Sequence, residues 1–451
     1  MTGRQLDVTV NGQLVGHLRE NNDLWEFEYS PEWATSTRGF DLSPELPCAQ
    51  AVHTDGASKR PVQWYFDNLL PEGLRGVIAK ESNLSAEDAF GLLTHFGAES
   101  AGSLVLHDPH HASALPASAE QGLKPLPLAG LSQRISNLPR VSLTRDAPKK
   151  MSLAGAQHKM LVVLRGDEGD HEENELFEPL PGTPSTHILK PNHPGDDYPA
   201  SVMNEYFSMR LAKAVGLDVP EVRRMYVPQP VYLVERFDRI KGKNTDEVQR
   251  RHVIDTCQLL GKARSFKYSA AHLDTLVQAV MLCRSRAVAR LQLYRWIVFN
   301  VLIGNGDNHL KNISFLADAA GVNVAPAYDL LCTAVYETRA MASEKARWPD
   351  TALAFSLGNA KTFATLTRAH VLEAGHALGL AATTAKRELN LFIKAVPLEA
   401  DKLIADIEAH NEKEVAASPD LEVARADIGG EMRMLRAIRH IVLADMAQQL
   451  A

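Results

Sequence analysis

A long apolar run that ends in a polar loop constrains this chain more than any other stretch. Residues 294–303 are mostly apolar and predict a buried helix. The run leads directly into residues 305–312, whose letters are N-G-D-N-H-L-K-N. Gly, Asn and Asp favour a loop. We therefore expect a core helix to carry Asp307 and Asn312 on a loop just past its end.

The spacing of Asp307 and Asn312 indicates a chemistry. An Asp followed five residues later by an Asn is the spacing of a phosphoryl-transfer loop, in which the Asp accepts the proton of the attacking hydroxyl and the Asn holds magnesium. Asp329 stands in the apolar setting A-Y-D-L of residues 327–330 and is the candidate for a second magnesium ligand. Because Asp and Asn are also common in loops for turn chemistry alone, an ordinary loop stays open at this point.

Composition excludes several classes of protein. With 45% apolar and 23% charged residues, the 451-residue chain resembles an ordinary globular protein with room for two or three domains. Its net charge of -7 argues against general binding of nucleic acid. The four cysteines have no paired spacing, and neither an apolar signal core nor a run of 18 apolar residues occurs. We expect a cytoplasmic protein with no membrane contact.

Periodicity predicts an α+β chain whose strands come mostly first. An alternating pattern at 5–17 around Asn11-Gly12 predicts a hairpin, and residues 85–95 predict a helix capped by Ser85. The acidic run 167–178 is interpreted as a solvated hairpin loop, with a metal site less favoured. From about 250 onward, starting at 252–260, the pattern is helical, with separate runs at 383–396 and 398–415. The expected divisions are an α+β module at 1–107, a linker region at 108–145, a strand-rich lobe at 146–245 and a large all-helical lobe at 246–451.

Three further features precede the loop at 305–312. Small residues in the loop 152–159 (S-L-A-G-A-Q-H-K) would let backbone N–H groups approach a phosphate closely. Lys190 closes an apolar strand at 186–190, and Glu205 on the next helix is a candidate ion-pair partner. The strand ending in V-E-R-F-D-R at 234–239 could pass an adenine. Taken singly, an ordinary turn and a charged strand end explain the first and third features as well, and a lysine that closes a strand usually just reaches solvent.

Taken together, these features stand in the order of a protein kinase. A phosphate loop, a strand lysine, a helix glutamate and a hinge strand are followed by a helical region with D-x-x-x-x-N and a second Asp. Phosphoryl transfer needs cations for the γ-phosphate charge, magnesium ligands and a base that positions the hydroxyl. The order therefore predicts a two-lobed protein-kinase-like fold.

Strings along nearly the whole chain resemble one known family, the HipA-type serine/threonine kinases, which are toxins of HipBA toxin–antitoxin modules. The N-terminal strings are FEYSPEWA at 27–34, FDNLLPEG at 66–73 and GAESAGSL at 97–104. Those of the nucleotide lobe are SLAGAQHK at 152–159, THILKP at 186–191, NEYF at 204–207 and VERFDR at 234–239. Those of the catalytic lobe are GNGDNHLKN at 304–312 and PAYDLL at 326–331. The chain departs from the family at Asn308, where a glycine is expected.

The resemblance implies a role for each matching residue. Asp307 is expected to be the catalytic base, Asn312 and Asp329 the magnesium ligands, and Ser152 a site of autophosphorylation that switches the kinase off. A phosphoserine adds roughly -1.5 to -2 charge beside the ATP phosphates, which should drive the loop out. The residues expected to contact ATP are Ala154, Gly155, Ala156, Gln157, His158, Lys159, Lys190, Glu235, Arg236, Phe237, His309, Leu310, Lys311, Asn312, Tyr328, Asp329, Leu330 and Leu331.

The resemblance also implies partners. A HipB-type helix-turn-helix antitoxin would bind the protein and bring it to operator DNA. The expected substrate is an aminoacyl-tRNA synthetase, such as glutamate–tRNA ligase, whose phosphorylation arrests growth. Two alternatives stay open: a non-catalytic nucleotide-binding co-repressor that acts with the antitoxin, and a small-molecule phosphotransferase, since antibiotic kinases share an Asp-x-x-x-x-Asn loop.

Overall fold

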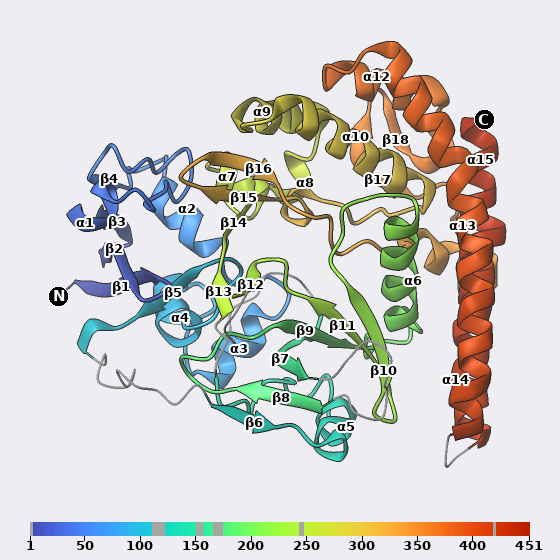
Figure 1. Ribbon diagram of the computed structural model, residues 1–451, viewed down its shortest axis with the longest axis horizontal. Coiled ribbons are helices and arrows are strands. Elements are labelled where there is room, and N and C mark those ends of the chain that lie inside the picture. Colours follow the sequence, from blue (N-terminus) through green and yellow to red (C-terminus); the bar gives the residue numbers. More distant parts are fainter. Residues whose placement is uncertain (1–2, 111–121, 150–156, 166–174, 243–247, 418–420) are drawn as a thin grey trace. The chain divides into compact units, whose positions relative to one another are not determined.

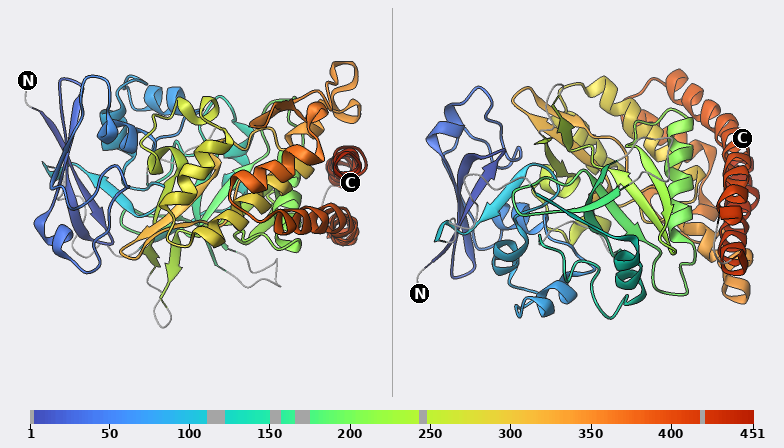
Figure 2. Two further views of the ribbon diagram at one scale, coloured as in Figure 1. Left: turned by 90° about the horizontal axis from the view of Figure 1, so that it is seen from above. Right: turned by 60° about the horizontal axis from the view of Figure 1, so that its bottom comes forward.

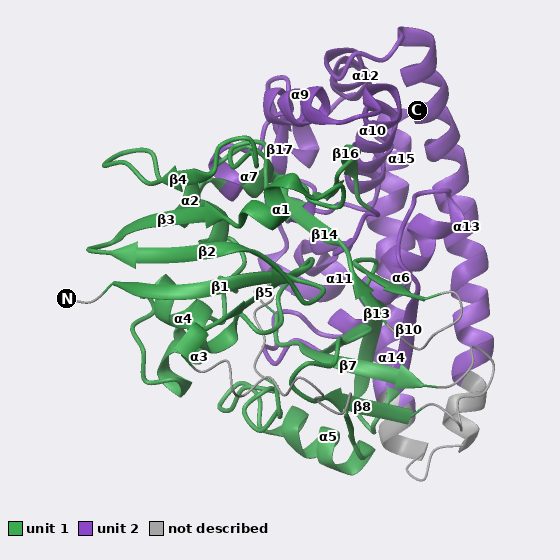
Figure 3. Ribbon diagram, turned by 60° about the vertical axis from the view of Figure 1, so that its left-hand side comes forward, with its two compact units in different colours: residues 1–191, 226–266, 314–325 green, residues 192–225, 267–313, 326–451 purple. Residues whose placement is uncertain are grey.

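The chain forms two compact units, drawn green and purple in Figure 3. The computed structural model describes residues 3–110, 122–149, 157–165, 175–242, 248–417 and 421–451, without the side chains of 412–417, 421–424 and 426. Unit 1 comprises Met1–Pro191, Tyr226–Phe266 and Ser314–Ala325, and unit 2 comprises Asn192–Met225, Lys267–Ile313 and Pro326–Ala451. The segments of the two units alternate along the sequence. The four consecutive domains expected from the sequence therefore stay a prediction.

The N-terminal sheet of unit 1 follows from alternation of buried and exposed side chains. Strand β1 (Arg4–Val10) buries every second residue from Leu6 onward. The hairpin predicted at Asn11-Gly12 is confirmed, and both residues adopt the positive φ that such a turn requires (47° and 80°). The five antiparallel strands have the order β4-β3-β2-β1-β5, with β2 at Gln13–Asn21, β3 at Leu24–Tyr29, β4 at Val52–Thr54 and β5 at Leu104–His107 (Figure 1).

Four short helices accompany this sheet. They are α1 (Pro31–Thr35), α2 (Pro61–Asp67), α3 (Arg75–Glu81) and α4 (Ala89–Phe96). A stretch that contains Pro71 and Gly73 separates α2 from α3. The predicted cap at Ser85 is wrong, because Asp88 caps α4: its Oδ1 accepts a hydrogen bond from the backbone N–H of Gly91 at 3.0 Å.

A second antiparallel sheet in unit 1 has the order β11-β9-β7-β8-β6. Its strands are β6 (Leu123–Pro125), β7 (Met160–Arg165), β8 (Glu175–Pro179), β9 (His187–Pro191) and β11 (Pro230–Glu235), with helix α5 at Leu128–Ser136. The acidic run predicted as a solvated loop lies partly in residues 166–174, outside the described residues. Glu178 corrects the rest of that prediction: it is buried in β8 and accepts two hydrogen bonds from Arg134.

The region expected to be all-helical contains strands, which corrects the predicted fold class. In unit 1, β14 (His252–Asp255) pairs with β15 (Ser314–Asp318), which pairs with β16 (Gly321–Val324). The stretch 252–260 was expected to be one helix. It divides at Asp255 because this residue forms a capping box with Gln258 and so starts the short helix α7 (Thr256–Leu259). Two further hairpins are β12 (Arg239–Lys241) with β13 (Val248–Arg250), and β17 (Ala352–Leu357) with β18 (Ala360–Thr362) in unit 2.

Helices dominate unit 2. The buried helix predicted before the polar loop at 305–312 is confirmed as α10 (Arg286–Leu302), and its second half is almost wholly buried. Helix α6 (Ser201–Ala214) carries Glu205, and Gly216 follows its end with a φ of 86°. Strand β10 (Val222–Tyr226) follows at the sequence boundary between the units. The other helices are α8 (Phe266–Ser269), α9 (Leu273–Leu282), η2 (Leu310–Asn312), η3 (Thr333–Glu337), α11 (Arg339–Ala342), η4 (Ser343–Lys345), η5 (Phe363–Thr365) and α12 (Arg368–Ala377).

A long helical hairpin closes the chain. The runs expected as two helices form a single helix, α13 (Ala382–Ala417), which continues through Pro397. It is followed by α14 (Leu421–Ala437), a π-helical turn η6 (Ile438–Val442) and α15 (Leu443–Leu450). Figure 2 shows α6, in green, beside this red hairpin. Among the described residues, no helix combines the length and apolar character that crossing a membrane requires.

Candidate active site

Asparagine side chains build the start of the polar loop at the end of α10. Asn305 donates from Nδ2 to Oδ1 of Asn300 at 2.7 Å, and its own Oδ1 accepts from the backbone N–H of Asp307 at 3.0 Å. Both asparagines are buried, so their polar atoms need these partners. Gly304 has a φ of 64°, which glycine adopts without strain. The loop is therefore held from the inside, while Asp307 itself is exposed.

The second half of the loop places Asn312 beside Asp307. The short helix η2 begins after His309, and Asn312 donates from Nδ2 to the backbone carbonyl of Asp307 at 2.9 Å. This hydrogen bond determines which end of the amide faces the loop. Among the described residues, Oδ1 of Asn312 accepts no hydrogen bond and stays available as a ligand. Asn308 has no positive φ, so the departure from the family's glycine needs no special backbone.

A hydrogen bond links the Asp329 segment to the same loop. The hydroxyl of Tyr328 donates to the backbone carbonyl of Lys311 at 2.7 Å, next to Asn312 in the chain. Asp329 has a φ of 57°, in the left-handed region that a residue with a Cβ seldom adopts. Strain of this kind is common at functional sites. The structure thus brings together Asp307, Asn312 and the segment that carries Asp329.

These side chains suit a magnesium ion. Magnesium prefers oxygen ligands and is usually bound through one or two carboxylates together with substrate phosphates. Asp329 supplies a carboxylate and Asn312 an amide oxygen with no competing donor. No cluster of three His, Cys, Asp or Glu that could hold a metal alone occurs in the described part of the chain. The donor set therefore fits an ion that also needs a phosphate ligand.

Helix α6 supports this segment through a residue that the sequence did not single out. Asn204 is fully buried, donates from Nδ2 to the carbonyl of Cys332 at 2.9 Å and accepts from the Cys332 N–H at 2.8 Å. The pair of bonds holds the chain three residues after Asp329. A buried asparagine within the apolar positions of a helix was the available signal. The neighbouring Glu205 is also buried, but Lys190 belongs to the other unit, so the predicted ion pair stays a prediction.

The predicted nucleotide residues of unit 1 lie on its second sheet. Lys190 is buried on β9 opposite Tyr232 of β11, with Nζ 5.8 Å from the centre of that ring. Gln157, His158 and Lys159 directly precede β7, and His158 is buried. Ser152, Ala154, Gly155 and Ala156 lie outside the described residues. Of the predicted phosphate loop, only its last three residues are thus placed.

The predicted hinge is divided between two environments. Glu235 is exposed at the end of β11, whereas Arg236 is buried. The backbone N–H of Arg236 donates to the carbonyl of Thr186 at 2.9 Å, so it is already paired within the sheet. Its side chain donates to Asp238 and Glu99 rather than turning toward a nucleotide. Of the three predicted hinge residues, Arg236 thus has its backbone N–H and its side chain engaged within unit 1.

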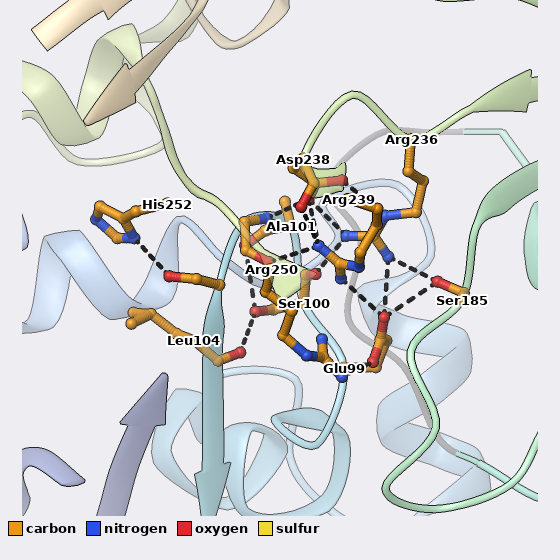
Figure 4. A network of polar contacts seen from close by, with 12 residues as sticks. Glu99, Ser100, Ala101, Leu104, Ser185, Arg236, Asp238, Arg239, Arg250 and His252 are labelled. Atoms are coloured by element: carbon orange, nitrogen blue, oxygen red, sulfur yellow. Dashed lines mark hydrogen bonds and ion pairs between the residues drawn. The ribbon is translucent and has the colours of Figure 1, made fainter. Parts of the chain in front are cut away.

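Glu99 is the centre of the network that receives Arg236 (Figure 4). This carboxylate is wholly buried and lies between 2.5 and 3.1 Å from nitrogen atoms of four cations, which are Lys149, Arg236, Arg239 and Arg250. Although burial raises the pKa of Glu99, the four cations outweigh it and hold the pKa well below its usual range. The sequence did not single out Glu99, and the available signal was a lone acid among small residues at 97–103.

Burial lowers the pKa of the lysine in this network, whereas it raises the pKa of a carboxylate. It lowers the pKa of Lys149 more than Glu99 raises it, and the nearby arginines lower it further, to about 8. Lys149 donates to Glu99 at 2.6 Å and to the carbonyl of Thr183 at 2.9 Å. Lys149 stands three residues before the predicted phosphate loop and is the last described residue on that side, and the network holds it within unit 1.

The sequence is similar to proteins of one family along most of its length. The sequence model of the HipA-like C-terminal domain matches residues 151–400, and that of the HipA N-terminal domain matches residues 6–107. Y4mE of Sinorhizobium fredii, provisionally named a kinase, is 37% identical over 74% of this chain and 79% of its own length. The serine/threonine-protein kinase toxin HipA of Shewanella oneidensis is 30% identical over 74% of this chain and 76% of its own length.

A solved structure supports the fold. HipA from Shewanella oneidensis MR-1, determined with HipB and operator DNA, superposes with a TM-score of 0.72 over 99% of both chains. The sequence identity in that superposition is 24%.

Proposed function

This chain belongs to the HipA family of serine/threonine kinase toxins, and from that premise we propose that it is an ATP- and magnesium-dependent protein kinase with Asp307 as its catalytic base. The observation that carries the proposal is the local geometry of one loop. Asp307 is exposed while its backbone is held by Asn305 and Asn312, and Tyr328 links the Asp329 segment to the same loop. These are the parts that phosphoryl transfer requires on its catalytic side.

The proposed reaction is a direct transfer. The oxygen of the acceptor hydroxyl attacks the γ-phosphorus of ATP, the bond from that phosphorus to ADP breaks, and Asp307 takes the hydroxyl proton. A magnesium ion held by Asn312 and Asp329 would neutralise charge on the phosphate oxygens. Lys190 would place a fixed positive charge on the nucleotide phosphates. Phosphate on Ser152 would then repel the ATP phosphates and switch the kinase off.

The proposed partners come from the relatives. The Shewanella protein was solved with HipB and operator DNA, and we infer that a HipB-type antitoxin brings this chain to DNA as well. The net charge of -7 supports an indirect contact with DNA. The proposed substrate is an aminoacyl-tRNA synthetase in the cytoplasm, such as glutamate–tRNA ligase.

Asp307→Asn tests the proposal, because an amide of the same shape cannot accept the proton. We expect the variant to lose about 100- to 10,000-fold in phosphate transfer from ATP and magnesium, with an unchanged unfolding midpoint. Asp274→Asn, at an exposed position on α9, is the matched control and should keep full activity. Mass spectrometry of phosphopeptides after brief expression of each protein identifies Ser152 and the protein acceptor.

The same experiment distinguishes the alternatives. Equal phosphate transfer by wild type and Asp307→Asn contradicts the assigned base. Nucleotide binding without any transfer, together with tight antitoxin binding, indicates the non-catalytic co-repressor. Transfer to small molecules but to no protein indicates a small-molecule phosphotransferase.

A further inference from the structure

The exposed carboxylate of Asp307 already holds a hydroxyl of this chain. The phenol of Tyr268, on the short helix α8, donates to Oδ1 of Asp307 at 2.6 Å. Both residues belong to unit 2. Half of the Tyr268 surface is exposed, so packing alone does not keep the side chain there.

The ring of Tyr268 has its own support beside the loop. It meets His309 edge to face, with ring centres 4.9 Å apart and planes at 78°. Such aromatic pairs contribute modestly beyond the area they bury. The hydroxyl is thus directed at the carboxylate by a contact with the loop itself. Loss of the hydroxyl alone would leave this ring contact in place.

The hydroxyl of Tyr268 lies at the distance from Asp307 that a proton-donating substrate would need. A general base must lie within about 2.6–3.2 Å of the group whose proton it takes. The Tyr268 oxygen meets that condition at Oδ1 of Asp307, one of the two carboxylate oxygens that can accept the proton of a substrate hydroxyl. A serine or threonine acceptor that uses this oxygen must first displace the phenol.

We propose that Tyr268 occupies the acceptor position on Asp307 and thereby sets the affinity of the kinase for its protein substrate. This inference rests on the proposed function. Tyr268 is a competitor of the acceptor and takes no part in the transfer. Removing its hydroxyl should therefore help the acceptor to bind and should leave ATP unaffected.

A carboxylate has a second oxygen, which allows the opposite role. Tyr268 could orient Asp307 through Oδ1 while the acceptor binds Oδ2. In that case removal of the hydroxyl lowers kcat, because the base loses its orientation. The two roles thus predict changes in different kinetic constants.

Tyr268→Phe separates the two roles. The acceptor is a synthetic peptide of residues 147–158, which contains Ser152, with ATP and magnesium as co-substrates. We expect the KM for the peptide to fall about three- to tenfold, because a hydrogen bond to an exposed charged group is released, while kcat and the KM for ATP stay within about twofold. Tyr198→Phe is the matched control: Tyr198 is 47% exposed, and its hydroxyl has no hydrogen bond among the described residues.

A second measurement is independent of catalysis. The protein is labelled with 3-fluorotyrosine, and the fluorine resonance that is missing in Tyr268→Phe is assigned to Tyr268. Asp307→Asn should shift this resonance, whereas Asp274→Asn should leave it in place. An unshifted resonance overturns the proposal, whatever the kinase assay gives.

The remaining outcomes are also decisive. An unchanged peptide KM, or a lower kcat, in Tyr268→Phe overturns the acceptor role and leaves the kinase itself standing. Absence of phosphate transfer in both proteins refutes the proposed function, and the acceptor role with it. A lower peptide KM together with a shifted resonance supports the proposal.

Discussion

At the scale of single residues, His252 shows how burial determines a charge state. It lies on β14, its Nε2 donates to the carbonyl of Leu42 at 2.9 Å, and its Nδ1 accepts from the hydroxyl of Ser103 at 3.1 Å. Phe40 stacks on the ring at 4.7 Å. Burial lowers the pKa of His252 to about 4, so the folded protein keeps the ring neutral at physiological pH.

This neutral histidine predicts a loss of stability in acid. The unfolded chain takes up a proton near pH 6.5 and the folded chain only near pH 4. Stability from this group is therefore complete above pH 6.5 and falls as the pH drops from 6.5 to 4, by about 3 kcal/mol in all. We expect the free energy of unfolding, measured with urea at several pH values from 4 to 7, to change less steeply with pH for His252→Gln than for wild type. His376→Gln, at an exposed position, is the control. An equal pH dependence of the unfolding free energy in all three proteins would contradict the neutral state of His252.

At the scale of elements, a buried ion pair ties β10 to the final helical hairpin of unit 2. Arg224 on β10 donates to Glu431 of α14 at 3.1 Å and to Asn411 of α13 at 2.7 Å. Its guanidinium also lies 5.7 Å from the ring centre of Tyr206 on α6. Both charged side chains are almost fully buried. Strand, helix and hairpin therefore meet at one cation.

Removing one charge of this pair should lower the free energy of unfolding more than removing both charges. Glu431→Leu leaves the Arg224 charge buried, and we expect a loss of about 3–5 kcal/mol in the free energy of unfolding. The double variant Arg224→Met/Glu431→Leu removes both charges and should recover most of that loss. The control is Glu399→Ala at a partly exposed position: it loses only the exposed Lys402 as a partner and should lower the free energy of unfolding by less than about 1 kcal/mol. Strictly additive losses in denaturant unfolding would argue against the coupling.

At the largest scale, the Glu99 network joins the two sheets of unit 1. Glu99 lies between α4 and β5 of the N-terminal module, whereas Lys149 and Arg236 belong to the part of the unit that carries the second sheet. The module that precedes the predicted nucleotide lobe is thus connected to it through buried charge. Because four cations pair with this one carboxylate, its loss would leave several buried positive charges without that partner.

Glu99→Gln tests how much this network contributes to the free energy of unfolding. The amide keeps the shape but leaves the cations without a carboxylate, and we expect a loss of about 3–5 kcal/mol in unfolding free energy near neutral pH. Since the pKa of Glu99 is lowered in the folded protein, its stabilisation is present above about pH 4.5 and fades in stronger acid. Wild type and variant should therefore converge at low pH. A variant as stable as the exposed control Glu87→Gln would refute the inference.

The sequence by itself determined what is local. The spacing of Asp307 and Asn312, the buried helix before them, the hairpin at Asn11-Gly12 and the family follow from short patterns, because periodicity and turn chemistry act between near neighbours. The same reasoning failed at 252–260, where four buried residues fit a strand as well as a helix. Only pairing with β15, far along the chain, decides between them.

The tertiary structure alone decided which residues far apart in the sequence pair with one another. Tyr268 lies 39 residues from Asp307, Asn204 lies 128 residues from Cys332, and Glu99 lies 137 residues from Arg236. Local sequence could at most mark such a residue and could not name its partner, because a buried polar atom takes whichever donor or acceptor the fold brings within reach. The sequence thus predicted a loop for phosphate transfer, and the fold placed the hydroxyl of Tyr268 on the carboxylate of Asp307, the predicted base.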